Sequence, residues 1–155
     1  MRPRGDCSAI EAIPLRLMIV AIVASLSIVP AADMLQSLKN REFVGRALIQ
    51  LEDLVTAAEI LAIEGPGGAR TLALDFRGDG PMRFRGLHIG DGNGGPNMSA
   101  AVLELSNGAA IVRMADSPPV WLRSGVGESL EIMSPIFELR MCGTLEGHTF
   151  FVLVE

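Results

Sequence analysis

An uncharged apolar run near the amino terminus constrains this chain more than any other feature of its sequence. The 16 residues from Leu17 to Ala32, LMIVAIVASLSIVPAA, carry no charge. Counted from Ala12, the run reaches 21 residues and includes Arg16. A helix of that length extends roughly 31 Å, which is enough to cross the hydrocarbon core of a bilayer. Arg16 lies near one end of the run, where its long side chain reaches the headgroups. The run therefore predicts a transmembrane helix.

Charges on either side of the run predict its orientation. Arg2 and Arg4 precede it, and Asp33 follows it directly. Because basic residues favour the cytoplasmic side, we expect the amino terminus in the cytoplasm and the rest of the chain outside the cell. The whole chain has 13 basic and 18 acidic residues, a net charge of −5, which argues against a nucleic-acid-binding surface.

A second helical pattern follows the apolar run. Between Asp33 and Glu64, apolar residues recur at steps of three and four, which is typical of an amphipathic helix. Gly65-Pro66-Gly67-Gly68 then provides a stop signal. The sequence predicts one nearly continuous helix from about Ser8 to Glu64, with kinks at two internal prolines. The stripe expected to pack on the β domain consists of Val44, Leu48, Leu51, Val55, Ala58 and Ala62.

After Gly68 the apolar period changes from helical to the alternation of strands. In RTLALDF, for example, Leu72, Leu74 and Phe76 share one face. Asn107-Gly108 is a hairpin signal, and Glu146-Gly147 is expected to turn the last pair of strands. The remaining strands are expected at Met82–Ile89, Ala101–Leu105, Ala109–Ala115, Val120–Leu122, Leu130–Met133, Phe137–Cys142 and Thr149–Val154. The fold class is thus α+β: a long amino-terminal helix, transmembrane and then amphipathic, followed by an antiparallel β-sheet or sandwich domain over residues 69–155.

The first eleven residues, MRPRGDCSAIE, precede the apolar run with a short basic leader, a glycine and a few polar residues. This arrangement resembles the class III signal sequence of archaeal type IV pilins and archaellin-like proteins. The resemblance implies that prepilin peptidase, a membrane aspartic peptidase, cuts between Gly5 and Asp6 and removes residues 1–5. Residues 6–32 then form a membrane or filament-core helix, 33–64 continue it, and 69–155 form an extracellular β domain. Self-association of the amino-terminal helices with other pilin subunits would build a filament used in adhesion.

Glu11 has a physical role within that plan. A carboxylate that enters an apolar helix bundle needs a partner, and the new amine of a neighbouring, processed subunit is a suitable cation. Glu11 would then set the register of assembly. Two alternatives stay open. The chain is either a single-pass, signal-anchored binding domain that does not polymerise, or a secreted protein cut after Ala31, with Val29 and Ala31 as the small residues of a signal peptidase site.

Several motifs suggest chemistry but have a simpler explanation. The tract Gly90–Gly95 contains GxGxxG, with Asp116 further on, yet no long helix is expected after it, so a loop is favoured over a nucleotide site. That loop also lacks the ligand set of a calcium site. His88 and His148 have no metal-ligand spacing, and two distant cysteines, Cys7 and Cys142, define neither a disulfide framework nor a zinc site.

The remaining candidates concern the surface of the β domain. Arg83 and Arg85 lie on one face of an expected strand, where a solvated face is favoured over an anion site. Trp121 is either an adhesive aromatic or a domain-edge anchor. Asn97 begins an Asn-Met-Ser sequon on the extracellular side and is a candidate for N-glycosylation. No catalytic, cofactor or metal site is expected, and the protein is predicted not to be an enzyme.

Overall fold

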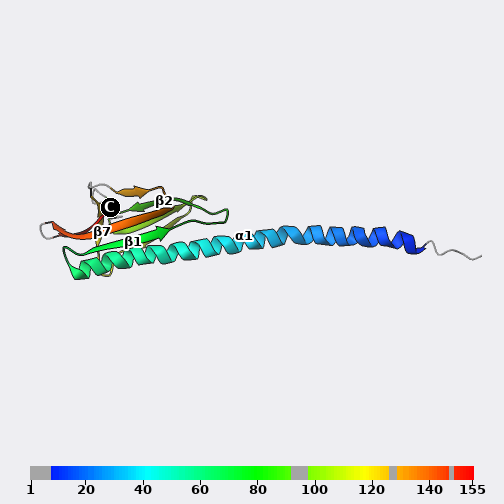
Figure 1. Cartoon of the computed structure of the whole chain (residues 1–155), viewed down its shortest axis with the longest axis horizontal. Coiled ribbons are helices and arrows are strands. Elements are labelled where there is room, and N and C mark those ends of the chain that lie inside the picture. The colour runs from blue at the N-terminus through cyan, green and yellow to red at the C-terminus, as the bar shows by residue number, and fades with distance from the viewer. Residues whose placement is uncertain (1–7, 92–97, 126–128, 147–148) are drawn as a thin grey trace, which may run out of the picture. The chain divides into compact units, whose positions relative to one another are not determined.

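The computed structural model describes residues 8–91, 98–125, 129–146 and 149–155. The chain divides into two compact units, Met1–Leu38 and Lys39–Glu155. One long helix, α1 (Ser8–Glu64), is followed by eight strands in two sheets, which is the α+β arrangement expected from the sequence. Figure 1 shows the order of these elements along the chain.

Helix α1 is unbroken over 57 residues, although it contains Pro14 and Pro30. Each proline removes one backbone donor, but neither ends the helix. The end comes at Gly65, where the predicted stop signal lies. Gly65 has a φ of 88°, and its N–H donates to the carbonyl of Leu61 at 3.0 Å, as in a helix cap with a left-handed residue. The turn that follows is tied to the β domain because Gly67 N–H donates to the carbonyl of Gly143 at 2.9 Å.

The second part of α1 belongs to the core of the second unit, but its buried face differs from the predicted one. Leu51, Val55 and Ala58 are buried as expected, whereas Val44, Leu48 and Ala62 are only half-buried. The buried face is turned toward the positions one residue earlier, and the buried side chain there is the larger one at Phe43, Leu54 and Leu61, although not at Ala47. The buried line consists of Phe43, Ala47, Leu51, Leu54, Ala58 and Leu61.

Eight strands follow the helix, and each lies where the alternation predicted one. They are β1 (Ala69–Asp75), β2 (Phe84–Ile89), β3 (Ala100–Leu105), β4 (Ala110–Met114), β5 (Trp121–Ser124), β6 (Leu130–Ile132), β7 (Ile136–Glu146) and β8 (Thr149–Val154). They form two four-stranded sheets, in the orders β1-β7-β8-β5 and β4-β3-β2-β6.

Strand pairing is antiparallel throughout the two sheets except between β5 and β8, which run parallel. The two sheets are antiparallel in every other pair, as predicted, and no signal in the sequence indicated this one parallel pair. The reason lies in the connection: the chain leaves β5, contributes β6 to the other sheet and returns through β7 before it forms β8. β5 and β8 are therefore not hairpin partners.

The predicted hairpin between β3 and β4 is present. Gly108 has a φ of 82°, and Asn107 Oδ1 accepts a hydrogen bond from Ala109 N–H at 3.0 Å. At the last hairpin, Glu146 on β7 pairs with Thr149 on β8, as predicted, while Gly147 lies outside the described residues.

The helix contributes to one core together with both sheets. α1 runs beside β1 (Figure 1), where the Gln50 side chain forms two hydrogen bonds with the backbone of Asp75. Its Nε2 donates to the Asp75 carbonyl, and its Oε1 accepts from the Asp75 N–H, both at 2.7 Å. On the other sheet, Arg113 of β4 lies 3.3 Å from Glu52. Since β1 is an edge strand, Gln50 satisfies the open backbone edge of its sheet at Asp75.

Candidate functional site

The first candidate is the exposed apolar surface of α1 in the first unit. Its large apolar side chains are between 48% and 71% exposed. The most apolar window of the helix has a mean hydropathy of 2.2, and none of it is buried. The helix is long and apolar enough to cross a membrane. Membrane spans, signal sequences and core helices share such length and composition, but a core helix has its apolar side chains covered by protein.

The residues predicted for processing and assembly lie at the start of this segment. Gly5 and Asp6 are outside the described residues. Glu11 lies in the first turns of α1, but its side chain is not among those described. Asn97, the candidate glycosylation site, also lies outside the described residues, as do Cys7 and His148.

Charged side chains gather on the outer face of the sheet that contains β2, β3 and β6. Arg85 Nε lies 3.8 Å from Glu104, and His88 Nε2 lies 3.7 Å from Glu104 and 3.9 Å from Glu131. All four side chains are at least one-third exposed. Because Glu104 lies beside Arg85 and Glu131 lies on the same face, this face does not favour an anion, and Arg85 is an exposed, solvated side chain.

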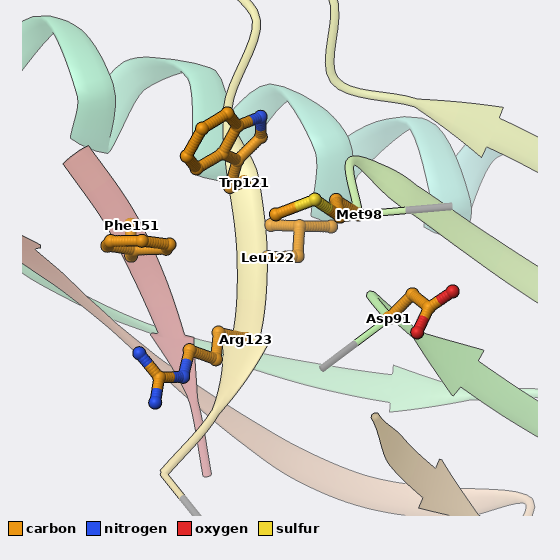
Figure 2. A pocket seen from close by; sticks show the side chains of 6 residues that line it. All are labelled: Asp91, Met98, Trp121, Leu122, Arg123 and Phe151. Carbon is orange, nitrogen blue, oxygen red and sulfur yellow. The ribbon is translucent and has the colours of Figure 1, made fainter. Parts of the chain in front are cut away.

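The second candidate is a pocket on the β domain, shown in Figure 2. Trp121 and Phe151 are direct partners in the parallel pair of β5 and β8. Their ring centroids lie 5.5 Å apart at an interplanar angle of 51°. The cavity holds about 260 Å³ and is lined by Asp91, Met98, Trp121, Leu122, Arg123 and Phe151.

Arg123 connects the aromatic pair with the charged groups near it. Its guanidinium carbon lies 5.6 Å from the centroid of the Phe151 ring. Its Nη1 donates to Glu146 Oε2 at 3.0 Å, so the cation is balanced by a carboxylate. Arg123 and Trp121 point to the same side of β5 because they are two residues apart on a strand. The result is an apolar surface with a charge pair beside it.

Backbone contacts fix the base of this pocket. Leu122 N–H donates to the carbonyl of Met98 at 2.7 Å, and Gly90 N–H donates to the carbonyl of Ala100 at 2.9 Å. Gly90 has a φ of 69°, and a Cβ at this position would lie 2.2 Å from the carbonyl oxygen of Leu122. Only glycine fits there. This close approach joins the end of β2 to β5 in the other sheet.

Gly90 also begins the GxGxxG tract. A dinucleotide site needs a helix after the glycines, whose amino terminus binds the phosphates. The described residues after the tract form a turn and then strand β3, so the loop interpretation stands. Gly90 instead allows the end of β2 to pack closely against β5.

No cluster of three or more His, Cys, Asp or Glu side chains with metal-binding geometry occurs among the residues that the structure describes. Cys142 is a half-buried free thiol on β7. Among the acidic residues that the structure describes, Asp75 at the end of β1 has the most perturbed pKa. Hydrogen bonds from the side chain and backbone of Arg77 lower the pKa of Asp75 to about 2. These two groups form a surface ion pair, with Arg77 Nη2 2.5 Å from Asp75 Oδ2.

Comparison with protein-family models, with curated proteins and with solved structures found no match for this chain.

Sequence reasoning singled out Trp121 but missed the pocket around it. The pocket joins residues from three separate segments, and Phe151 is about 30 positions from its ring partner. Only the parallel pairing of β5 and β8 brings the two rings together. The alternation of apolar residues along a strand does not show which strands pair with one another, so the sequence pattern could not predict this pocket.

Proposed function

We propose that this chain is an archaeal type IV pilin-like subunit. Prepilin peptidase removes residues 1–5, residues 6–32 anchor the subunit in the membrane, and the β domain faces outside. Subunits then associate through their amino-terminal helices into an extracellular filament that serves adhesion. The role is structural and not catalytic.

One observation carries this proposal: the two parts of a single helix have different surroundings. In the first unit, apolar side chains on every side of α1 are exposed, from Leu15 to Leu38. In the second unit, one face of the same helix is buried against the sheets, from Phe43 to Leu61. The first part must be covered by lipid or by other chains, because water does not favour so large an apolar surface. A subunit that moves from the membrane into a filament needs one helix segment that lipid or other subunits can cover and a second segment that packs on its own β domain.

The position of Glu11 supports the same proposal. Glu11 precedes the uncharged run and lies in α1. A carboxylate in a filament core of packed apolar helices requires a cation. Cleavage after Gly5 creates such a cation at Asp6 of every subunit. A neighbouring subunit can then supply the amine only when the two helices have the correct stagger.

The test is filament formation in a host that carries prepilin peptidase. We expect the wild-type protein in filaments sheared from the cell surface and visible by electron microscopy. Glu11→Ala should remove most of the protein from the sheared fraction while leaving its amount in the membrane unchanged. Glu42→Ala is the matched control, because Glu42 is an exposed acid on the same helix outside the apolar run.

Two results would contradict the proposal. If the wild-type chain stays in the membrane fraction and no filament forms, it is a single-pass anchor for an extracellular binding domain. If the protein appears in the medium as a soluble monomer that begins near Ala32, the apolar run is a secretory signal.

A further inference from the structure

The second unit, residues 39–155, is basic at the end where the chain enters it and acidic elsewhere. We call this end the basic end. Its cations are Lys39, Arg41, Arg46, Arg77 and Arg83, and its acids are Glu42, Asp75 and Asp79. Five basic and three acidic residues give it a net charge of +2. The rest of the second unit has five basic and twelve acidic residues, a net charge of −7.

Two segments form the basic end: the first turns of α1 in the second unit and the loop between β1 and β2. Contacts between them are specific. Asn40 Oδ1 accepts a hydrogen bond from Met82 N–H at 3.3 Å, and Arg46 Nη2 donates to the carbonyl of Arg77 at 3.4 Å. Arg77 and Arg83 line the same pocket. The basic residues of the helix and of the loop therefore lie on one surface.

The carboxylates of the basic end do not balance all of its cations. Two cations have acidic partners there, in the pairs Arg77–Asp75 and Arg46–Glu42. The other three are exposed, and among the residues that the structure describes their side chains form no ion pair or hydrogen bond; they are Lys39, Arg41 and Arg83. Arg83 differs in this respect from Arg85, which lies beside Glu104. Three cations are thus available to an anionic partner.

The chain itself holds the basic end near the bilayer of the proposed function. Lys39 follows the last residue of the apolar run, Ala32, by seven positions, and α1 is unbroken over this stretch. Seven residues of helix span about 10 Å. Large apolar side chains stay exposed as far as Leu38, which brings the membrane surface closer still. Charges act over about 8 Å at physiological ionic strength, so the basic end lies within reach of lipid headgroups.

A second copy of this chain is the other source of anionic groups, but many of its carboxylates already have partners. Four acids outside the basic end pair with cations of their own chain: Glu52, Glu64, Glu104 and Glu146. Glu59 accepts hydrogen bonds from the backbone N–H groups of Asp116 and Ser117. A bilayer, in contrast, meets the basic end of every anchored subunit before any second copy arrives. The observations favour the membrane.

We propose that the basic end binds the phosphate groups of anionic lipids at the membrane surface. Arg41 and Arg83 each present a guanidinium fork that matches a phosphate, and Lys39 adds a third cation. The same surface repels the acidic remainder of the second unit, so only the basic end can face the bilayer. This inference goes beyond the proposed function and rests only on its membrane anchor.

The test uses the full chain in a neutral detergent and native mass spectrometry, which counts bound lipids and protein copies together. The probes are phosphatidylglycerol and phosphatidylcholine with the same acyl chains, each titrated separately. The double variant Arg41→Gln/Arg83→Gln removes two exposed cations of the basic end. Its matched control, Arg123→Gln/Arg140→Gln, removes two cations from other parts of the second unit and changes the net charge equally.

We expect phosphatidylglycerol to bind the wild-type chain more tightly than phosphatidylcholine does. Arg41→Gln/Arg83→Gln should raise the Kd for phosphatidylglycerol about tenfold or more, since each basic residue near an anionic surface strengthens binding about fivefold. The control variant should keep the wild-type Kd. Every variant retains the basic residues of the first unit, so lipid bound there cancels in the comparison. Melting temperatures show whether each variant is folded.

The inference is overturned if both lipids bind the wild-type chain equally, or if the two double variants lose the same affinity for phosphatidylglycerol. It is also overturned if the wild-type chain forms dimers that Arg41→Gln/Arg83→Gln loses and that phosphatidylglycerol does not displace, because the basic end then binds a second copy.

These results do not depend on cleavage or assembly. A chain that binds phosphatidylglycerol through its basic end but forms no filament would refute filament assembly alone. A filament subunit whose lipid binding does not depend on the basic end would refute this inference alone.

Discussion

Replacing Leu51 with alanine tests whether the second part of α1 belongs to the core of the β domain. Leu51 is fully buried at the centre of the helix face that packs on the sheets. Truncating a buried leucine costs about 2–5 kcal/mol, from lost burial and the cavity left behind. Alanine returns a few tenths of a kcal/mol through its higher helix propensity. We therefore expect a loss of about 3 kcal/mol, or about 12 °C in melting temperature for a domain of roughly 120 residues.

The assay is thermal and urea unfolding followed by the fluorescence of Trp121, which lies in the β domain and is unaffected by tryptophans elsewhere because there are none. Ile49→Ala is the matched control: Ile49 is on the same turn of helix but is 63% exposed, so its loss should change stability by less than about 0.5 kcal/mol. Leu51→Asp places an unpaired charge in the core and should unfold the domain. If Leu51→Ala melts within 2 °C or so of Ile49→Ala, the helix does not share the domain core.

Three further predictions concern the β domain. Gln50→Ala removes both hydrogen bonds to the backbone of Asp75 and should cost about 1–3 kcal/mol in urea unfolding; an unchanged midpoint would refute their contribution. Gly90→Ala should destabilise the domain more than Gly108→Ala, since both have positive φ but only Gly90 has a backbone oxygen in the way; equal losses would show that the close approach relaxes. The lowered pKa of Asp75 means that its pair with Arg77 stabilises the fold above about pH 3.8 and loses this effect as the pH falls through about 2. The stability difference between wild type and Arg77→Gln should therefore shrink over that interval, and a difference that stays constant from pH 5 to pH 2 would contradict the assignment.

The helix and the strands were predictable because their signals are local. The uncharged run, the period of three and four residues after Asp33, and the glycines from Gly65 onward each occupy a short stretch of sequence. The buried face of the helix was predicted only in part. Phe43 and Leu54 were not assigned to the stripe, yet both are buried, because the sheets decide which side of a broadly apolar helix is covered.

The arrangement of the strands depends on contacts between distant residues, which local patterns do not encode. The parallel pair of β5 and β8 and the close approach of Gly90 to Leu122 both join segments far apart in the chain. In the sequence, Gly90 stands out as part of a phosphate-binding motif. In the structure, glycine is required there because the backbone at the end of β2 approaches Leu122 of β5 closely. The pocket around Trp121 depends on both of these contacts and for that reason could not be predicted from the sequence.

The amino-terminal sequence and intact mass of the protein, isolated from its native cell surface and membrane, show whether this chain is processed as a pilin-like membrane protein. We expect a chain that begins at Asp6, with the apolar run retained, in both fractions. A chain that begins at Met1 would contradict processing and identify a membrane anchor. A chain that begins near Ala32 would contradict both anchoring and assembly.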